Sequence, residues 1–141
     1  MQTSFSPAQL ADPETAHAEG IIRKCVHCGF CTATCPTYVT LGNELDSPRG
    51  RIYLIKDMLE NDRPADATVV KHIDRCLSCL ACMTTCPSGV NYMHLVDHAR
   101  ARWGAFHPEP PAVAALAAGL RARFDPAGLL NPGRMAPARA T

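Results

Sequence analysis

The sequence contains no run of about 18 apolar residues, which is the length that a membrane-spanning helix needs. It also lacks a strong charge of either sign, because 14 basic and 13 acidic residues leave a formal net charge of +1. So small a charge does not suggest nucleic-acid binding. The first residues are polar and have no apolar segment of the kind found in secretory signal peptides. We therefore expect no transmembrane segment, no nucleic-acid partner and a reducing, cytoplasmic setting.

Cysteine is absent before Cys25 and after Cys86. All 8 cysteines lie between these positions, in two runs that cover residues 25–36 and 76–87. Both runs read C-x2-C-x2-C-x3-C-P, a spacing typical of proteins that hold paired [4Fe–4S] clusters through thiolates. The sequence therefore predicts two [4Fe–4S] clusters as cofactors.

The same spacing predicts which cysteines share a cluster. Three cysteines at intervals of three can wrap three corners of one cubane, and in two-cluster ferredoxins the fourth, next to proline, ligates the other cluster. We expect cluster 1 to be held by Cys25, Cys28, Cys31 and Cys86, and cluster 2 by Cys76, Cys79, Cys82 and Cys35.

Other metal chemistry fits the cysteine runs less well. Structural zinc usually takes two C-x2-C pairs that are separated by a longer spacer. A disulfide framework is typical of small secreted proteins, and no secretory signal precedes these cysteines. His27 lies inside the first run and could replace a thiolate, but four thiolates are already available for each cluster. We expect His27 to be exposed or to lie beside the cluster.

Capping and periodicity signals predict a mainly α fold, an α-helical ferredoxin domain with two [4Fe–4S] clusters. Asp12-Pro13, Ser47-Pro48 and Asp66 resemble helix starts. Apolar residues then recur at helical spacing, so we expect them in the core. The predicted core positions are Ile52, Ile55, Met58, Leu59, Val69, Val70, Ile73, Leu95, Val96 and Ala99. Residues 1–12 are expected to be a mobile lead-in, residues 1–105 the cluster domain, and residues 106–141 a linker, a short helix and a tail.

Several basic residues carry open interpretations. Arg49 and Arg51, at a predicted helix start, could stabilise anionic clusters or dock an acidic partner, although a solvated turn is equally consistent with their charge. Arg75 precedes Cys76 and could raise the potential of its cluster. His94 and His98 share a helix face, a spacing that can bind zinc; without the rest of a zinc motif we expect a surface face.

Three segments together resemble the iron–sulfur subunit of glycolate oxidase (glycolate dehydrogenase). They are Cys25 to Tyr38, Gly42 to Lys56 with its Ser-Pro-Arg-Gly-Arg-Ile stretch, and Cys76 to Tyr92 with Cys-Pro-Ser-Gly-Val. The resemblance covers roughly residues 1–102. It implies an electron-transfer subunit that receives electrons from FAD-containing glycolate oxidase subunits, which oxidise the 2-hydroxy acid. FAD is expected only on those partners.

Two departures from the family limit what the resemblance implies. The family continues into a C-terminal part with Cys-Cys-Gly motifs, whereas this sequence has no cysteine after Cys86. Residues from about Trp103 onward, with the segment Phe124 to Met135, instead resemble the C-terminus of the FAD-binding subunit of the same enzyme. Alternatives are a free-standing ferredoxin-like carrier, a structural metal module, or the iron–sulfur subunit of a related lactate or glycerol-3-phosphate dehydrogenase. The family leaves open a peripheral association with the inner face of the cell membrane through the complex.

Overall fold

The computed structural model describes residues 1–103 and 111–124. These residues form helices, turns and loops and contain no strand, which confirms the mainly α fold class. The chain divides into two compact units, Met1–Ala105 and Phe106–Thr141. Among the described helices, none combines the length and the apolar character needed to cross a membrane.

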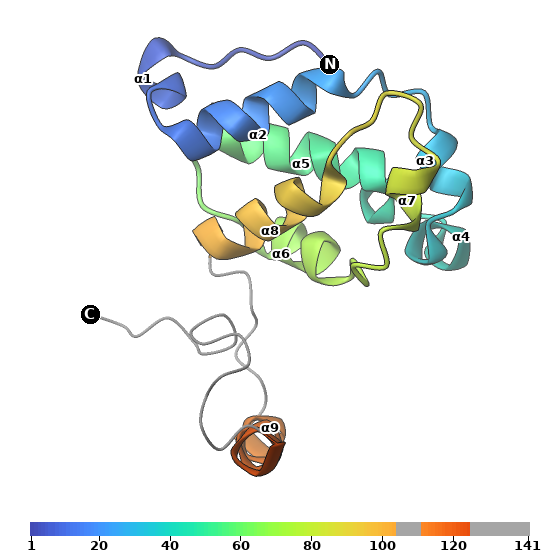
Figure 1. The fold of residues 1–141 in the computed structure, drawn as a ribbon, viewed down its shortest axis with the longest axis vertical. Coiled ribbons are helices and arrows are strands. Elements are labelled where there is room, and N and C mark those ends of the chain that lie inside the picture. The colour runs from blue at the N-terminus through green and yellow to red at the C-terminus, as the bar shows by residue number, and fades with distance from the viewer. Residues whose placement is uncertain (104–110, 125–141) are drawn as a thin grey trace. The chain divides into compact units, whose positions relative to one another are not determined.

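The first unit contains nearly all of the described helices (Figure 1). In chain order these are α1 (Pro7–Leu10), α2 (Pro13–Lys24), α3 (Phe30–Ala33), α4 (Pro36–Leu41), the 3-10 helix η1 (Glu44–Asp46), α5 (Pro48–Glu60), α6 (Ala67–Asp74), α7 (Ala81–Thr84) and α8 (Tyr92–Trp103). The helices α2, α5 and α8 pack against one another. The loops that carry the cysteines lie together at one end of these three helices (Figure 1).

The predicted helix starts are confirmed by their caps. The Asp12 carboxylate accepts a hydrogen bond from the backbone N–H of Thr15 at the start of α2. The Ser47 hydroxyl accepts one from Gly50 at the start of α5. The Asp66 carboxylate does the same for the first turn of α6. Each cap satisfies an N–H group that has no partner within its helix, and so fixes where the helix begins.

The core lies between α2, α5, α6 and α8. Nearly all of the predicted core positions are buried, and only Val70 is intermediate in exposure. The buried set includes Ile21, Ile22, Ile52, Ile55, Met58, Leu59, Val69, Ile73, Leu95, Val96 and Ala99. Cys25 and Cys82 belong to the same buried cluster, so the core continues directly into the cysteine-bearing end.

The prediction of a mobile lead-in over residues 1–12 is wrong. Ser6 and Gln9 form a capping box at the start of α1. The Gln9 side chain then donates hydrogen bonds to the backbone oxygens of Leu59 and Glu60, at 2.9 and 3.0 Å. The Ser4 N–H donates to the Glu60 carboxylate at 2.6 Å. These contacts join residues that are 50 or more positions apart in the sequence, so no local pattern could reveal them.

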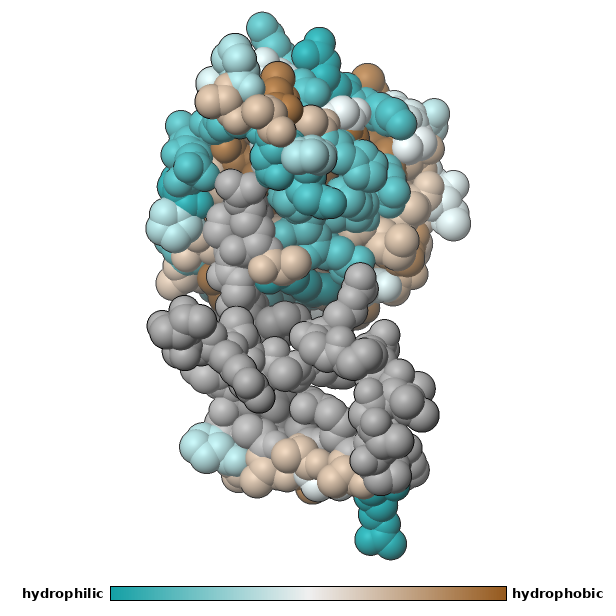
Figure 2. Space-filling view, turned by 60° about the vertical axis from the view of Figure 1, so that its left-hand side comes forward, coloured by the Kyte–Doolittle hydropathy of each residue, from teal (hydrophilic) through white to brown (hydrophobic). Residues whose placement is uncertain are grey.

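In the second unit the structure describes one helix, α9 (Pro111–Phe124), which confirms the short helix predicted there. Leu116 on this helix is exposed. The tail that resembles an FAD-binding subunit lies, beyond Phe124, outside the described residues. The interpretation of the two units as a cluster domain and a tail stays a prediction. For the first unit, the face turned to the viewer in Figure 2 is mostly hydrophilic, with hydrophobic side chains scattered at its edges.

Candidate metal centre

The two cysteine loops follow one backbone course. His27 and Gly29 in the first loop have positive φ values of 55° and 85°. Ser78 and Leu80, at the equivalent positions of the second loop, have φ values of 51° and 59°. Each loop then enters a four-residue helix, α3 or α7, and these two helices pack against each other.

This backbone course suits an anionic ligand. Left-handed residues within a tight loop turn successive backbone N–H groups toward one concave side, an arrangement that binds phosphates and iron–sulfur clusters. Glycine adopts this conformation freely, whereas a leucine needs support from its surroundings. Gly29 therefore suits its position in the first loop. The sequence gave no sign that Leu80 would adopt the same conformation in the second.

The fold gathers the cysteines around two cavities. The first is lined by Cys25, Cys28, Cys31 and Cys86, together with Cys82. The second is lined by Cys35, Cys76, Cys79 and Cys82. Each loop therefore contributes to both cavities, because Cys35 reaches the cavity of the second loop and Cys86 reaches that of the first.

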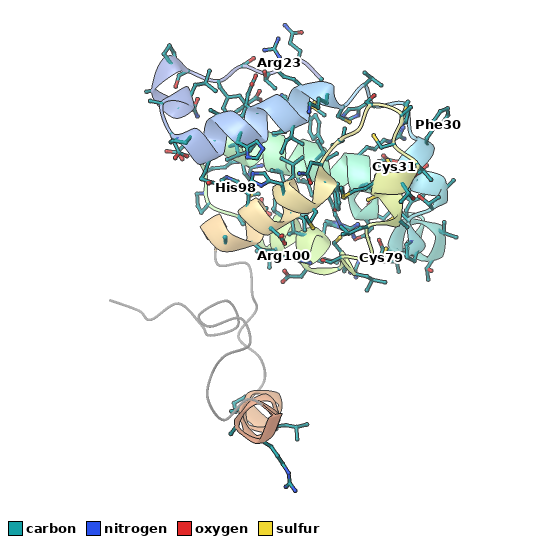
Figure 3. The ribbon with its side chains drawn as sticks, in the orientation of Figure 1. Arg23, Phe30, Cys31, Cys79, His98 and Arg100 are labelled. Carbon is teal, nitrogen blue, oxygen red and sulfur yellow. The ribbon has the colours of Figure 1, made fainter. Side chains whose placement is uncertain are left out.

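The cysteines differ in how far they reach the surface. Cys25, Cys35 and Cys82 are buried, whereas Cys28 and Cys79 are exposed. Figure 3 shows Cys31 and Cys79 at the same end of the first unit. Each cavity thus has a buried wall and an edge that solvent can reach.

Burial and the closeness of other cysteines raise the pKa values of two thiols, Cys82 and Cys31. Burial raises the pKa of Cys82 to about 12, and the nearby Cys31, Cys76, Cys35 and Cys79 add to the shift. The pKa of Cys31 is also raised, first by burial, although the backbone N–H of Arg49 opposes the change. Thiols held this close together repel one another as thiolates, so they need a positively charged centre to ionise, and metal binding would release their protons.

The N-terminus of α5 lies between the two cavities. Pro48 lines both of them, Arg49 lines the first and Arg51 lines the second. A helix N-terminus carries partial positive charge and favours anions. The solvated-turn interpretation is wrong for Arg51, whose side chain is only 1% exposed.

Arg51 belongs to a buried polar network. Its Nε donates to the backbone oxygen of His72 at 2.6 Å, and its guanidinium lies 3.5 Å from the Asp46 carboxylate. Asp46 is itself fully buried and also contacts His72 at 2.8 Å and Arg75 at 3.1 Å. Burial alone would raise the pKa of Asp46. The hydrogen bonds and charges of His72 and Arg75 outweigh it, so the pKa lies below its usual value.

The ion pair between Arg75 and Asp46 affects the prediction that Arg75 raises the potential of its cluster. Its guanidinium is turned toward a buried carboxylate, so part of its charge is neutralised before it can act on a neighbouring site. His27 is exposed and lines the first cavity, as expected for a residue beside the site rather than a ligand.

Polar groups approach individual sulfur atoms. The Thr37 hydroxyl lies 3.2 Å from the sulfur of Cys35, and the Arg51 guanidinium lies 3.9 Å from it. The Tyr92 hydroxyl donates to the sulfur of Cys76 at 3.5 Å. Hydrogen bonds to ligating sulfurs are one of the ways in which a protein sets the potential of a cluster. Sequence reasoning gave neither Thr37 nor Tyr92 a role, because the cysteine spacing does not show which hydroxyl approaches a sulfur.

Residues 21–90 match the family described as "4Fe-4S dicluster domain". This segment contains every cysteine and both cavities. The chain contains a 4Fe-4S dicluster domain. The prediction of two [4Fe–4S] clusters is thereby confirmed. The geometry of the dicluster domain fits them, since each cavity offers at least four thiols beneath a loop whose backbone suits an anion.

The similarity to individual proteins covers more residues than the family match does. The chain is 55% identical over 100 residues to the "Glycolate oxidase iron-sulfur subunit" of Escherichia coli (strain K12), covering 71% of this chain and 24% of that protein. It is 45% identical over 83 residues to the "Probable glycolate oxidase iron-sulfur subunit" of Bacillus subtilis (strain 168), covering 58% of this chain and 19% of that protein. The predicted resemblance is confirmed: the chain is a homologue of these subunits. It spans about a quarter or less of their length. No solved structure matches it significantly.

Proposed function

We propose that this chain is the electron-transfer part of a glycolate oxidase-type complex. The observation that carries the proposal is a dicluster domain whose cysteine-rich end reaches the surface, in a chain homologous to glycolate oxidase iron–sulfur subunits. FAD-containing subunits of the same complex are the proposed electron donors. Substrate oxidation would take place on them, and this chain would not be catalytic on the substrate by itself.

We further propose the crossed ligand sets that the cysteine spacing predicts. Cys25, Cys28, Cys31 and Cys86 would hold one cluster, and Cys76, Cys79, Cys82 and Cys35 the other. The lining of the two cavities supports this arrangement, since every proposed ligand lines the cavity of its own set. Cys82 lines both cavities, and we place it with the second set because its own loop supplies Cys76 and Cys79.

Paired alanine substitutions test the crossed sets. With crossed ligands, Cys25→Ala and Cys86→Ala damage the same cluster, so the double variant should keep about four irons per chain. Cys76→Ala with Cys86→Ala should damage both clusters and leave almost none. If each run held its own cluster, the two outcomes would be exchanged. Iron counting and EPR of the reduced, anaerobically reconstituted proteins distinguish the two cases.

The residues of the chain would shape electron transfer rather than perform bond chemistry. The clusters, when bound, supply one-electron transfer. The exposed Cys28 and Cys79 would bring the edge of each cluster to the surface, where a partner can approach. Val26, Phe30 and Leu77 next to them are exposed hydrophobic side chains and offer apolar contact area for that partner. Arg51, Thr37 and Tyr92 would tune the second cluster through its sulfurs.

Glycolate-driven reduction tests the function. The cluster-loaded chain is mixed anaerobically with the FAD-containing glycolate oxidase subunits, and the cluster absorbance and EPR signals are followed after glycolate is added. We expect reduction only when both partner and glycolate are present, with lactate and glycerol 3-phosphate as controls for the related dehydrogenases. Clusters that dithionite reduces but glycolate with partner does not would contradict the proposal. A stable complex in the same mixture separates a dedicated subunit from a free carrier.

The cellular location and the tail belong to the same proposal. We place the complex in the cytoplasm, with contact to the inner face of the membrane through its other subunits.

Residues 106–141 would act as a docking appendage. A chain that ends at Ala105 should then load its clusters normally but bind the flavoprotein more weakly, and unchanged binding would contradict the docking role.

A further inference from the structure

A cluster of imidazoles lies in the first unit between α2 and α8. His94 and His98 follow each other by one helical turn on α8, and their rings stack with centroids 6.1 Å apart. The expectation that they form a surface face is wrong, because both are partly buried and the His98 side chain is only 8% exposed. His17 on α2 lies against His94 with ring centroids 4.0 Å apart. The fold thus brings three histidines together from two facing helices.

A carboxylate completes this cluster. Glu14, in the first turn of α2, places a carboxylate oxygen 3.8 Å from Nδ1 of His98. One ligand atom from each of Glu14, His94 and His98 lies within 4.8 Å of the others. The Nε2 atom of His94 is enclosed by protein and has no hydrogen-bond partner in the described structure. A buried ring nitrogen normally has such a partner, so a bound ion would account for it.

This donor set matches the preferences of one class of ion. Two imidazoles and a carboxylate on facing helices suit a borderline divalent metal, above all zinc, which such ligands hold at about 2.0–2.2 Å. Ligand atoms around zinc are then about 3.3 Å apart, so the Glu14–His98 distance of 3.8 Å has to close by roughly 0.5 Å, and no pair of the three atoms by more than roughly 1.5 Å. Glu14 can supply part of this movement, because its side chain is 67% exposed. The same exposure gives a metal ion a path from solvent.

We propose that Glu14, His94 and His98 form a zinc site that joins α2 to α8, separate from the cysteine cavities. Figure 3 shows His98 between these two helices, well away from Cys31 and Cys79. The two helices connect directly to the candidate centre, since α2 leads into Cys25 and the loop after Cys86 leads into α8. A zinc ion here joins the helix that precedes Cys25 to the helix that follows Cys86. The neighbouring His17 or a water molecule fills the fourth position.

Zinc titration of the cluster-loaded protein tests the site. The protein is purified with its clusters so that its cysteines are occupied, and zinc binding is followed by calorimetry under anaerobic conditions. We expect one zinc per chain with no loss of iron. X-ray absorption at the zinc edge should show only nitrogen and oxygen neighbours near 2.0–2.1 Å, whereas zinc on cysteine would show sulfur near 2.3 Å.

Three variants separate the site from adventitious binding. Glu14→Gln changes an exposed side chain and should weaken zinc binding at least tenfold, while His94→Asn with His98→Asn should abolish it. Asp97→Asn is the matched control, because Asp97 is an exposed carboxylate beside His98 on the same helix. The proposal is overturned if the parent protein binds no additional zinc, if the bound zinc has sulfur neighbours, or if Glu14→Gln binds zinc as tightly as the parent. The iron content of each variant checks that it folds.

Discussion

Arg51 is the largest side chain that the described fold buries almost completely. An arginine in such a place costs free energy unless its charge is paired and its N–H groups are bonded. Here Asp46, the His72 carbonyl and the Thr37 hydroxyl meet those needs, and the remaining contact is the sulfur of Cys35. The arginine therefore couples the polar interior of the unit to one proposed cluster ligand.

Replacing Arg51 should change both stability and redox behaviour. Arg51→Met removes a positive charge beside Cys35 and takes one partner from the buried Asp46. We expect a loss of about 3–5 kcal/mol in the free energy of unfolding. We also expect a lower reduction potential for the cluster that Cys35 ligates, because a nearby positive charge favours the reduced, more negative cluster. Anaerobic denaturation and EPR-monitored redox titration measure the two effects.

Lys56→Met is the control for this substitution. Lys56 lies on the same helix and pairs with Glu60 at 2.6 Å, in a partly buried contact outside both cavity linings. The Lys56→Met substitution should leave the potentials unchanged, because Lys56 lines neither cavity. It should also cost less stability than Arg51→Met, because Glu60 keeps its hydrogen bond from the Ser4 N–H. Equal potentials in the Arg51→Met and parent proteins would show that Arg51 does not act on the cluster.

At the scale of elements, α5 and η1 approach each other so closely that only glycine fits at position 50. A Cβ atom there would lie 2.0 Å from the backbone oxygen of Glu44 and 2.8 Å from its carbonyl carbon. Backbone cannot move aside as a flexible side chain can. This contact sets the start of α5, and with it the positions of Arg49 and Arg51.

Two alanine substitutions test the contact. Gly50→Ala should destabilise the protein by about 3 kcal/mol or more, because α5 and η1 must separate. Gly20 lies inside α2, and a Cβ atom added there would have nothing within 4 Å. Gly20→Ala should therefore stabilise the protein by about 0.5–1 kcal/mol, because alanine favours the helix more than glycine does. Denaturant unfolding of both cluster-loaded variants measures the difference. A Gly50→Ala protein as stable as the parent would contradict the close approach.

The elements also show what the sequence can and cannot predict. The helix starts predicted at Asp12, Ser47 and Asp66 were correct, because an N-cap side chain bonds to a backbone N–H only three positions away. The short helix α1 was missed although Ser6, Pro7 and Gln9 give a local signal for its start, and its attachment to the far end of α5 by hydrogen bonds is not local. The surroundings of His94 were misjudged for the same reason, because they depend on the packing of α2 against α8.

The candidate centre was more predictable than its surroundings. A C-x2-C-x2-C-x3-C spacing is itself a local signal, and it led to the cysteines that line each cavity. The burial of Arg51 and Asp46 could not be foreseen, because charged residues are expected at the surface unless their partners are known. Asp46 and Arg51 lie on the neighbouring η1 and α5, but their partners His72 and Arg75 lie on α6 and at its C-terminal cap, more than 20 residues away in sequence.

At the scale of the whole first unit, the core and the candidate centre are continuous. Cys25 and Cys82 are part of the buried cluster, and Cys31, Cys76 and Cys86 pack against it. Small domains have limited apolar cores, and bound metal often supplies much of their stability. Without its clusters, the unit would have crowded thiols and a gap where its core should end.

Removal of the clusters should therefore weaken the entire unit. We expect the iron-free protein to melt at least about 10 °C lower than the cluster-loaded one, which corresponds to roughly 2 kcal/mol for a domain of this size. The transition should also lose cooperativity. Circular dichroism during thermal unfolding, under reducing conditions without iron, measures the change. Identical melting curves for the two forms would show that the protein fold does not depend on its metal.

The repeated course of the two cysteine loops has one more consequence. Both loops place left-handed residues at the same two positions, and the Thr34 and Thr85 hydroxyls that follow them meet at 3.2 Å. Because the two loops repeat one backbone course, they offer both clusters the same backbone surroundings and cannot give them different reduction potentials. A difference in potential has to come from the side chains around each cavity, such as Arg49 beside the first and the buried Arg51 beside the second. Any difference in potential between the two clusters would therefore depend on a few substitutable residues more than on the course of the loops.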